Sequence, residues 1–148
     1  MKEIREYVFD TLEADPAIQG FTGYTASDKR IYLAWPPEDV ELTSSLPAYM
    51  TYKLAISPLD QVEYVEDAQE DDILIELNVW ANDPDIRDQL AERIGILFKD
   101  HSFYTTSFRV VYTKLEAKED MEELHESTGQ IISWRKFMQF LMGPIYRL

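Results

Sequence analysis

The sequence contains no cysteine, and this absence excludes several kinds of site at once. Disulfide frameworks, thiolate metal centres and cysteine nucleophiles all require that side chain, and its absence fits a reducing compartment. Glycine is also scarce, with 5 residues in 148. Neither a glycine-rich phosphate-binding loop nor the G-x-S-x-G nucleophile turn is present. Most of the short motifs that identify enzymes are therefore missing.

Long apolar runs are missing too. No stretch approaches the roughly 20 consecutive apolar residues that a membrane helix needs. The N-terminal segment MKEIREYVFDTLEAD is charged throughout and lacks the apolar centre of a signal peptide. We therefore expect a soluble protein with no membrane partner.

Basic residues are few relative to acidic ones. The chain has 28 acidic and 14 basic residues, which gives a formal net charge of -14. Phosphate backbones repel such a chain, which argues against a conventional nucleic-acid binder. The same repulsion suits a channel through which DNA must slide without adhering. The hydrophobic share of 45% argues against disorder, and the length predicts a single domain over residues 1–148.

Hydrophobic periodicity predicts the order helix, strand, strand, strand, helix, strand, strand. The expected helices cover residues 3–13 and 83–98, and the expected strands cover about 30–35, 48–57, 73–80, 108–115 and 130–140. Asp83 is a good N-cap and Pro84 suits the first helical position. Residues 17–28 are expected to form a loop. This order predicts an α+β fold: a two-layer domain with a mostly antiparallel sheet and helices on one face.

Two acidic segments lie between the expected strands. Leu59 to Asp72 is predicted to form the far end of a long β-hairpin, which a neighbouring subunit would stabilise. Residues 116–126, within an acidic insertion at about 116–128, are predicted to form a solvated loop or a short helix. A C-terminal strand and tail would occupy 130–148, where Pro144 is expected to break any regular element.

Residues that could carry chemistry do not form a recognisable set. His101 and His125 have no second ligand at helical spacing, so we interpret both as surface residues. The acidic segments lack the glycine and the spacing of a calcium-binding loop. We therefore predict no cofactor, no metal, no catalytic residue and no enzymatic activity. The aromatic residues near the expected strands are interpreted as core and subunit-interface residues, with a small-molecule pocket as the alternative: Trp35, Tyr49, Tyr52, Trp80 and Trp134.

Four blocks of the sequence carry a family resemblance. They are TLEADPAIQGF (11–21), RIYLAWPPE (30–38), SLPAYMTYKL (45–54) and ILIELNVWANDPDIRDQLAERIGILF (73–98). In this order the chain resembles the tail terminator, or tail completion, proteins of long-tailed bacteriophages over about residues 1–115. The third block is similar to the family's Leu-Pro strand entry, carried by Leu46, Pro47 and Tyr52. The fourth is similar to its Val-Trp-Ala turn before a helix.

The resemblance implies a structural role in the virion. It implies a ring, usually of six copies, that caps the tail tube and presents a surface to the head-side connector or stopper protein. DNA would pass through the ring without specific binding. The protein would lie in the neck region of the tail, after assembly in the host cytoplasm. The family brings no catalytic residues with it.

The ring hypothesis assigns roles to charged residues. Acidic residues around the expected hairpin end, and in 116–126, are predicted to face the lumen or a neighbouring subunit: Glu63, Glu66, Asp67, Glu70, Asp71 and Asp72. Basic residues are predicted to bridge subunits and offset their mutual repulsion: Arg87, Arg93, Arg109, Arg135 and Lys136.

Three alternatives remain open. The first is another phage structural protein, either a head–tail connector or a tail tube subunit. The second is an acidic inhibitor that mimics DNA, which would be a monomer or dimer that binds a basic partner. The third is a small hydrolase or ligand-binding domain, which would need a closed pocket with converging polar groups.

Overall fold

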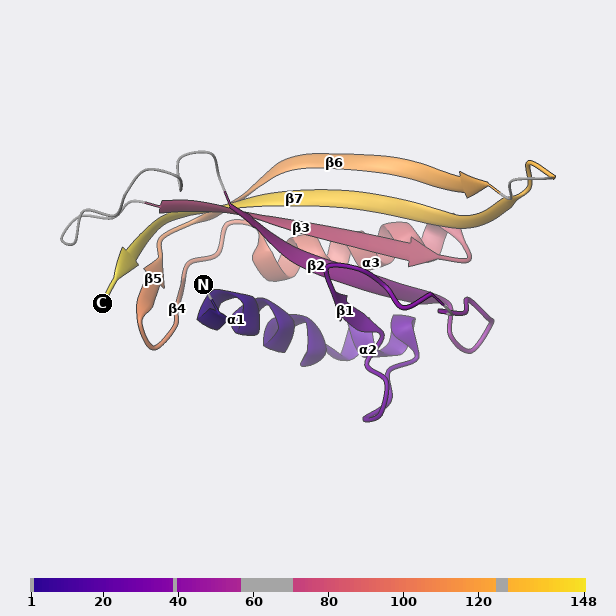
Figure 1. The fold of residues 1–148 in the computed structure, drawn as a ribbon, viewed down its shortest axis with the longest axis horizontal. Coiled ribbons are helices and arrows are strands. Elements are labelled where there is room, and N and C mark those ends of the chain that lie inside the picture. The colour runs from indigo at the N-terminus through magenta and orange to yellow at the C-terminus, as the bar shows by residue number, and fades with distance from the viewer. Residues whose placement is uncertain (1, 39, 57–70, 125–127) are drawn as a thin grey trace.

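The structure, a computed structural model, describes residues 2–38, 40–56, 71–124 and 128–148. Within these residues the chain forms three helices and a seven-stranded sheet, which is an α+β fold (Figure 1). The elements in chain order are α1 (Lys2–Glu13), α2 (Pro16–Thr22), β1 (Ile31–Leu33), β2 (Ala48–Ile56), β3 (Asp71–Ala81), α3 (Pro84–Phe98), β4 (Phe103–Tyr104), β5 (Phe108–Val110), β6 (Thr113–Leu124) and β7 (Ile131–Arg147).

The sheet is mixed, whereas the sequence predicted a mostly antiparallel one. Its strand order is β1-β2-β3-β7-β5-β4, and β6 also pairs with β7. β1 runs parallel to β2, with Ile31 opposite Met50, and the other described pairs are antiparallel. The parallel pair arises because residues 34–47 carry the chain back to the end of the sheet where β1 began. The periodicity of a three-residue strand carries no information about its direction.

β2 and β3 pair without a break from Ala48 opposite Ala81 to Ile56 opposite Ile73. This pairing agrees with the two arms of the hairpin predicted from their alternating apolar residues. The predicted far end, Leu59 to Asp72, lies outside the described residues except for the last two, which begin β3. The interpretation of that segment stays a prediction.

β7 is the central strand of the sheet and corrects one prediction. Pro144 was expected to break any regular element, yet β7 continues through it to Arg147. The proline lies where β7 changes partners, from β6 before it to β5 after it, and where its register with β3 shifts. Proline is tolerated at such an irregularity because no regular ladder bond is needed there. Its carbonyl still accepts a hydrogen bond from the Val111 amide at 3.1 Å.

β6 corrects a second prediction, because residues 116–126 were expected to form a loop or a short helix. Up to Leu124 they belong to a 12-residue strand that pairs along β7, from Thr113 opposite Met142 to Leu124 opposite Ile131. In the described residues β6 has only β7 as a strand partner. Charged side chains are common on such edges, because they disfavour unwanted strand pairing.

The helices form as their end signals predict, with one addition. The Asp83 side chain accepts hydrogen bonds from the amides of Asp85 and Ile86, which confirms the predicted cap of α3. α2 was expected to be loop. It begins at Pro16 because the Asp15 side chain caps it, accepting from the Ile18 amide at 3.2 Å.

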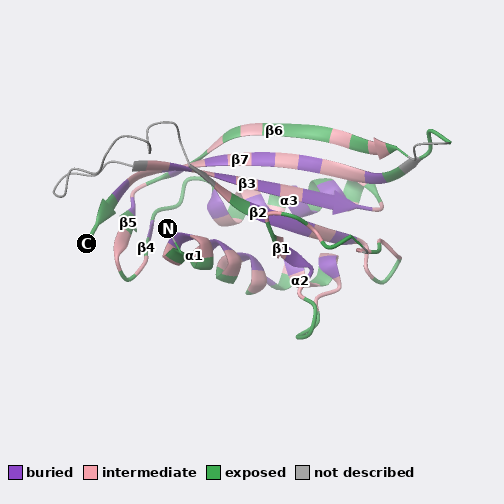
Figure 2. Cartoon of the chain, in the orientation of Figure 1, coloured by how far each residue is buried: buried purple, intermediate pink, exposed green. Residues whose placement is uncertain are grey.

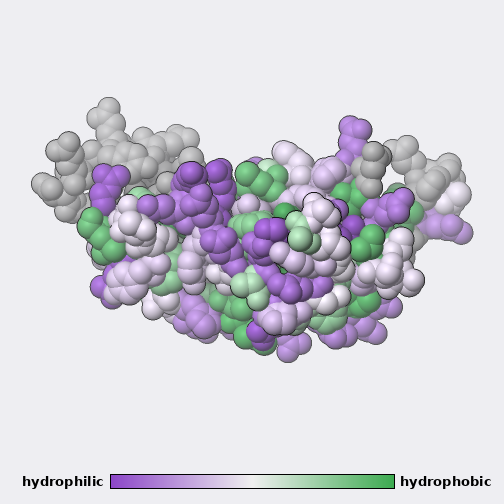
Figure 3. Space-filling view, turned by 90° about the horizontal axis from the view of Figure 1, so that it is seen from below, coloured by the Kyte–Doolittle hydropathy of each residue, from purple (hydrophilic) through white to green (hydrophobic). Residues whose placement is uncertain are grey.

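The three helices lie on the same side of the sheet, below it in Figure 1. β3 alternates buried and half-buried residues along Ile73–Val79, and the buried ones face the helices (Figure 2). Seen from the helix side, the surface mixes hydrophilic and hydrophobic side chains (Figure 3). The core residues from the helices and the central strands include Ile4, Val8, Leu12, Ile18, Leu90, Ile94, Ile75, Leu77, Val79, Met138 and Phe140.

Candidate functional site

An open groove of about 520 Å³ lies between the first turn of α3 and the β6–β7 hairpin. Pro84 and Arg87 of α3 form one wall, and residues 120–122 of β6 with Trp134 of β7 form the other. The groove occupies the end of the molecule where β3 finishes and α3 begins, on the right in Figure 1. We call it the α3–β6 groove.

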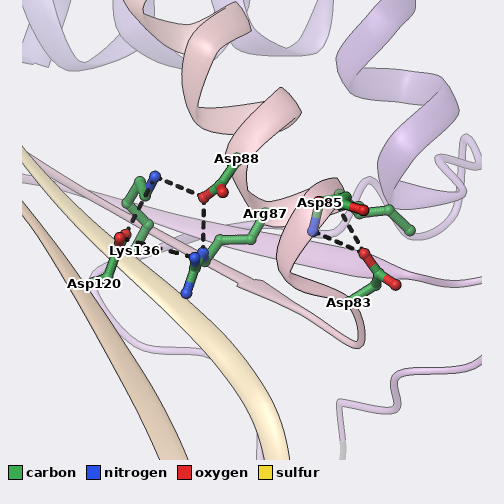
Figure 4. A network of polar contacts seen from close by, with 7 residues as sticks. Asp83, Asp85, Arg87, Asp88, Asp120 and Lys136 are labelled. Atoms are coloured by element: carbon green, nitrogen blue, oxygen red, sulfur yellow. Dashed lines mark hydrogen bonds and ion pairs between the residues drawn. The ribbon is translucent and has the colours of Figure 1, made fainter.

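Two residues that line this groove, Arg87 and Asp120, belong to an ion-pair network (Figure 4). The Lys136 ammonium lies 2.7 Å from an Asp88 carboxylate oxygen and 3.2 Å from one of Asp120. Arg87 contacts the same Asp88 oxygen through Nε at 2.9 Å and reaches Asp120 through a terminal nitrogen at 3.8 Å. Lys136 and Arg87 are buried, while both carboxylates are about half exposed. The network thus fixes α3 against the hairpin and leaves the carboxylates at the surface.

The electrostatics of the network follow from its hydrogen bonds. The Lys136 ammonium, followed by the Arg87 guanidinium, holds the pKa of Asp88 below its usual value, and partial burial opposes them. Asp88 is therefore ionised at neutral pH. Glu122 at the groove mouth is exposed and has no ion-pair partner among the described residues. The groove therefore presents carboxylate oxygens, and its own cations are already satisfied.

The sheet face opposite the helices carries an aromatic cluster. The rings of Tyr49 and Trp80 stack at 5.0 Å, and the Arg135 guanidinium lies 5.0 Å from the Trp80 ring. The Trp80 indole donates to Glu123 at 2.8 Å, and Arg135 donates to Asn78 at 2.8 Å. Burial, with a smaller effect of Glu123, raises the pKa of Tyr49 to about 12. The cluster thus joins β2, β3, β6 and β7. Its two charged side chains, Glu123 and Arg135, are both hydrogen-bonded within it.

The opposite end of the molecule carries an exposed arginine in place of the buried cations of the groove. Arg109 on β5 is exposed and lies 5.8 Å from the Tyr104 ring, and it faces Tyr146 of β7 in register. Tyr104 is opposite Arg109 on β4, so the three side chains form one row across three strands. We call it the Tyr–Arg row. Arg109 makes no ion pair with any described residue.

The basic residues that the sequence predicted to bridge subunits thus have different surroundings. Arg93 forms a bidentate pair with Asp15, at 2.7 and 3.0 Å, and ties α3 to the start of α2. Arg87, Arg93 and Lys136 therefore make ion pairs within the chain, and Arg135 packs on Trp80. Arg109 alone of the five is exposed. Bridging between subunits stays a prediction for all of them.

The acidic residues predicted at the hairpin end are largely outside the described part. Glu63, Glu66, Asp67 and Glu70 lie there, whereas Asp71 and Asp72 begin β3. The Asp72 carboxylate lies 1.8 Å from the position that a Cβ at Gly143 would take, so a larger residue at 143 would displace that side chain. His101 is exposed, with a ring nitrogen 2.9 Å from the Ile96 carbonyl, and His125 is not described.

The described residues contain no group of three or more metal-ligating side chains that could hold an ion. Each helix in the described part is too short or too polar to span a bilayer. The arrangement offers surfaces for contact with another macromolecule: a carboxylate-rimmed groove at one end and a Tyr–Arg row at the other.

No family model and no curated protein matches the sequence. Solved structures give a clearer result. The fold is shared with a virion chain. That chain belongs to the virion of a native gene transfer agent (GTA) particle, and it matches with a TM-score of 0.60 and 15% identity over 94% of this chain and 92% of the GTA chain. A second solved structure, whose name carries no function, gives a TM-score of 0.50 and 9% identity over 96% and 95%.

The sequence did not reveal the α3–β6 groove. Its walls come from three separate segments, and residues 120–122 were expected to form a loop or helix. One signal was present: Leu115 and Ala117 alternate with Lys114, Glu116 and Lys118, which is the period of a strand. Beyond residue 118 the sequence signal fades because acidic side chains occupy both faces of β6, although burial still alternates at residues 120–124.

Proposed function

We propose that the protein is a structural subunit of a phage-like virion, which forms a ring of six copies at the end of the tail tube and joins the tube to the head connector. One observation carries the proposal: a chain of the GTA virion has the same fold over nearly the full length of both chains. The order of the four sequence blocks supplies the narrower assignment to a tail terminator.

The physical character of the chain supports an assembly role. Its described clefts are open, and the larger one is lined by two carboxylates: Asp120, which pairs with buried cations, and Glu122, which has no described ion-pair partner. Nothing in that groove resembles an activated nucleophile beside a base. Exposed tyrosine and arginine side chains, such as those of Tyr104 and Arg109, are typical of protein interfaces.

The high negative charge agrees with a channel role. A ring of chains that each carry a formal charge of -14 would repel DNA from its inner wall. The same charge opposes ring closure, so apolar burial and cross-subunit contacts must offset it. We therefore propose that added salt strengthens the ring by screening this repulsion.

The test is the mass and position of the assembled protein. Native mass spectrometry and negative-stain microscopy of the purified chain, alone and with finished tail tubes, should give a species near six times 17.3 kDa and a ring on one end of each tube. Raising the salt concentration should increase the ring population. Rings that dissociate at high salt would contradict the charge argument.

Other outcomes favour the alternatives. Stacking into long tubes would indicate a tail tube subunit, and binding to isolated head connectors without tubes would indicate a connector protein. A chain that stays monomeric beside tubes and binds a basic protein tightly would indicate a DNA mimic. Turnover of a small substrate would indicate an enzyme and would end the proposal.

A further inference from the structure

The α3–β6 groove and the Tyr–Arg row lie at opposite ends of the long axis of the molecule (Figure 1). The groove lies where β3 ends and α3 begins, and the row lies on β4, β5 and the C-terminal end of β7. A single chain therefore cannot bring the two surfaces together. Two copies in the same orientation can.

The chemistry of the groove suits an arginine side chain. Asp120 and Glu122 place carboxylates at its mouth, and Glu122 has no described ion-pair partner. Trp134 lines the same groove and offers an aromatic surface. A guanidinium can bind a carboxylate through two parallel hydrogen bonds and can stack on an indole. The carboxylates and the Trp134 ring of the groove therefore both favour an arginine side chain.

The chemistry of the row supplies that side chain. Arg109 is exposed between two tyrosines of neighbouring strands, and Tyr104 is 63% exposed. Arginine and tyrosine are the residues most often found at the energetic centre of protein interfaces. Within this acidic chain, an exposed arginine with no described carboxylate partner is complementary to the groove of another copy.

We propose that the Tyr–Arg row of one subunit docks in the α3–β6 groove of the next, with Arg109 paired to Glu122 and stacked near Trp134. The proposal rests on the proposed ring and names the contact that builds it. A head-to-tail contact of this kind repeats from copy to copy and closes into a ring when the rotation allows. A two-fold contact that paired each surface with itself would bring groove to groove or arginine to arginine, and like charges would oppose it. A two-fold dimer that paired groove and row reciprocally would stop at two copies, so its cross-links would end at the dimer.

Charge reversal tests the pairing. Arg109→Glu and Glu122→Arg should each raise the subunit concentration at half-assembly by about tenfold or more, as for other interface hot spots. The double variant Arg109→Glu with Glu122→Arg restores opposite charges and should recover most of the loss. Arg147→Glu is the matched control, because it reverses an exposed arginine at the same end but outside the row. Residues 57–70 stay unchanged in every variant.

Cross-linking gives a second, geometric readout, because the chain has no cysteine of its own. Pro84→Cys lies in the α3 wall of the groove, and Thr106→Cys lies on the exposed turn between β4 and β5 beside the row. A chain with both cysteines should give a ladder of multimers with a short bismaleimide. A mixture of the two single variants should give dimers only, and either single variant alone should give none. A control with Glu92→Cys in place of Pro84→Cys should give no ladder.

The outcomes separate this inference from the proposed function. If microscopy shows rings of the double-cysteine variant that give no ladder, the docking proposal is wrong and the ring survives. If Pro84→Cys alone cross-links efficiently, groove meets groove across a two-fold contact and the proposal is wrong. If the wild-type chain stays monomeric at high concentration and beside tubes, and no ladder forms, both proposals are overturned.

Discussion

Replacing Asp15 tests how the helical layer is held together. Its carboxylate is 4% exposed and makes two interactions. It accepts a hydrogen bond from the Ile18 amide, which caps α2, and it binds Arg93 of α3 at 2.7–3.0 Å. Asp15→Ala removes both, whereas Asp15→Asn keeps a capping oxygen and removes the charge. The pair of variants therefore separates the cap from the ion pair.

The expected magnitudes follow from the two interactions. Loss of an N-cap costs about 1 kcal/mol, and loss of a hydrogen-bonded charge partner costs about 1.5–3 kcal/mol. The Arg93 side chain is 37% exposed, so water can hydrate it after the change and limit the penalty. We expect Asp15→Ala to lower the free energy of unfolding by about 2–4 kcal/mol, and Asp15→Asn by about 1 kcal/mol less.

Urea denaturation followed by circular dichroism measures these differences. Asp10→Ala on the exposed face of α1 is the control and should stay within about 0.5 kcal/mol of the wild type. Equal and small losses for both Asp15 variants would refute the reasoning. A loss for Asp15→Asn as large as that for Asp15→Ala would refute the role of the cap.

The pH dependence supplies an independent check on the same residue. The hydrogen bond from Arg93 lowers the pKa of Asp15, and burial opposes it in part. A lowered pKa contributes stability that is present above the unfolded value of about 3.9 and is lost as the pH falls through the folded value. The stability gap between wild type and Asp15→Asn should therefore be constant near neutral pH and shrink below about pH 4. A gap that widens on acidification would contradict this.

Three further variants test other contacts. Gly23→Ala should destabilise the protein by about 2 kcal/mol, because Gly23 has φ +70 and a Cβ there would meet a Leu46 methyl at 2.6 Å. Gly20 has open space around it, so Gly20→Ala should instead stabilise α2 by about 0.5–1 kcal/mol. Thermal unfolding measures both changes. Lys136→Met should cost about 1–3 kcal/mol by urea denaturation, since Asp88 and Asp120 each lose one of their two cations and keep only Arg87; no loss would mean that the Lys136 contacts do not stabilise the fold. Asp88→Asn should flatten the fall in stability on acidification, because the lowered pKa of Asp88 means that its stabilising charge is lost as the pH falls; an unchanged pH profile would contradict this.

The parts of the fold that the sequence predicted well are those with local signals. α3 has an N-cap, a proline in its first turn and an apolar stripe, and it begins at Pro84 as expected. β2 and β3 show clean alternation because one face of each packs on the core. Such signals need no knowledge of the partner element.

The parts that the sequence missed depend on distant partners. Residues 17–28 were interpreted as loop because Gly20, Gly23, Ser27 and Asp28 suggested turns, yet Asp15 both caps α2 and binds Arg93 from far along the chain. The second half of β6 carries acidic residues on both faces, so its sequence gives little strand signal and its pairing with β7 defines it. The α3–β6 groove could not be predicted for the same reason, because its walls come together only when β6 pairs with β7 in the observed register.

The position of β7 in the sheet has a consequence for synthesis. Among the described strands it is the last to be synthesised, yet it lies between β3 and β6 and contributes Phe140, Met138 and Met142 to the core. Until residues 131–147 emerge, the β3 edge has no neighbour on that side and much of the apolar interior stays open to solvent. Folding must therefore be completed late, through contacts between distant parts of the chain, which is a slow step and exposes the nascent protein to chaperones. The core cannot close before translation has passed through this strand.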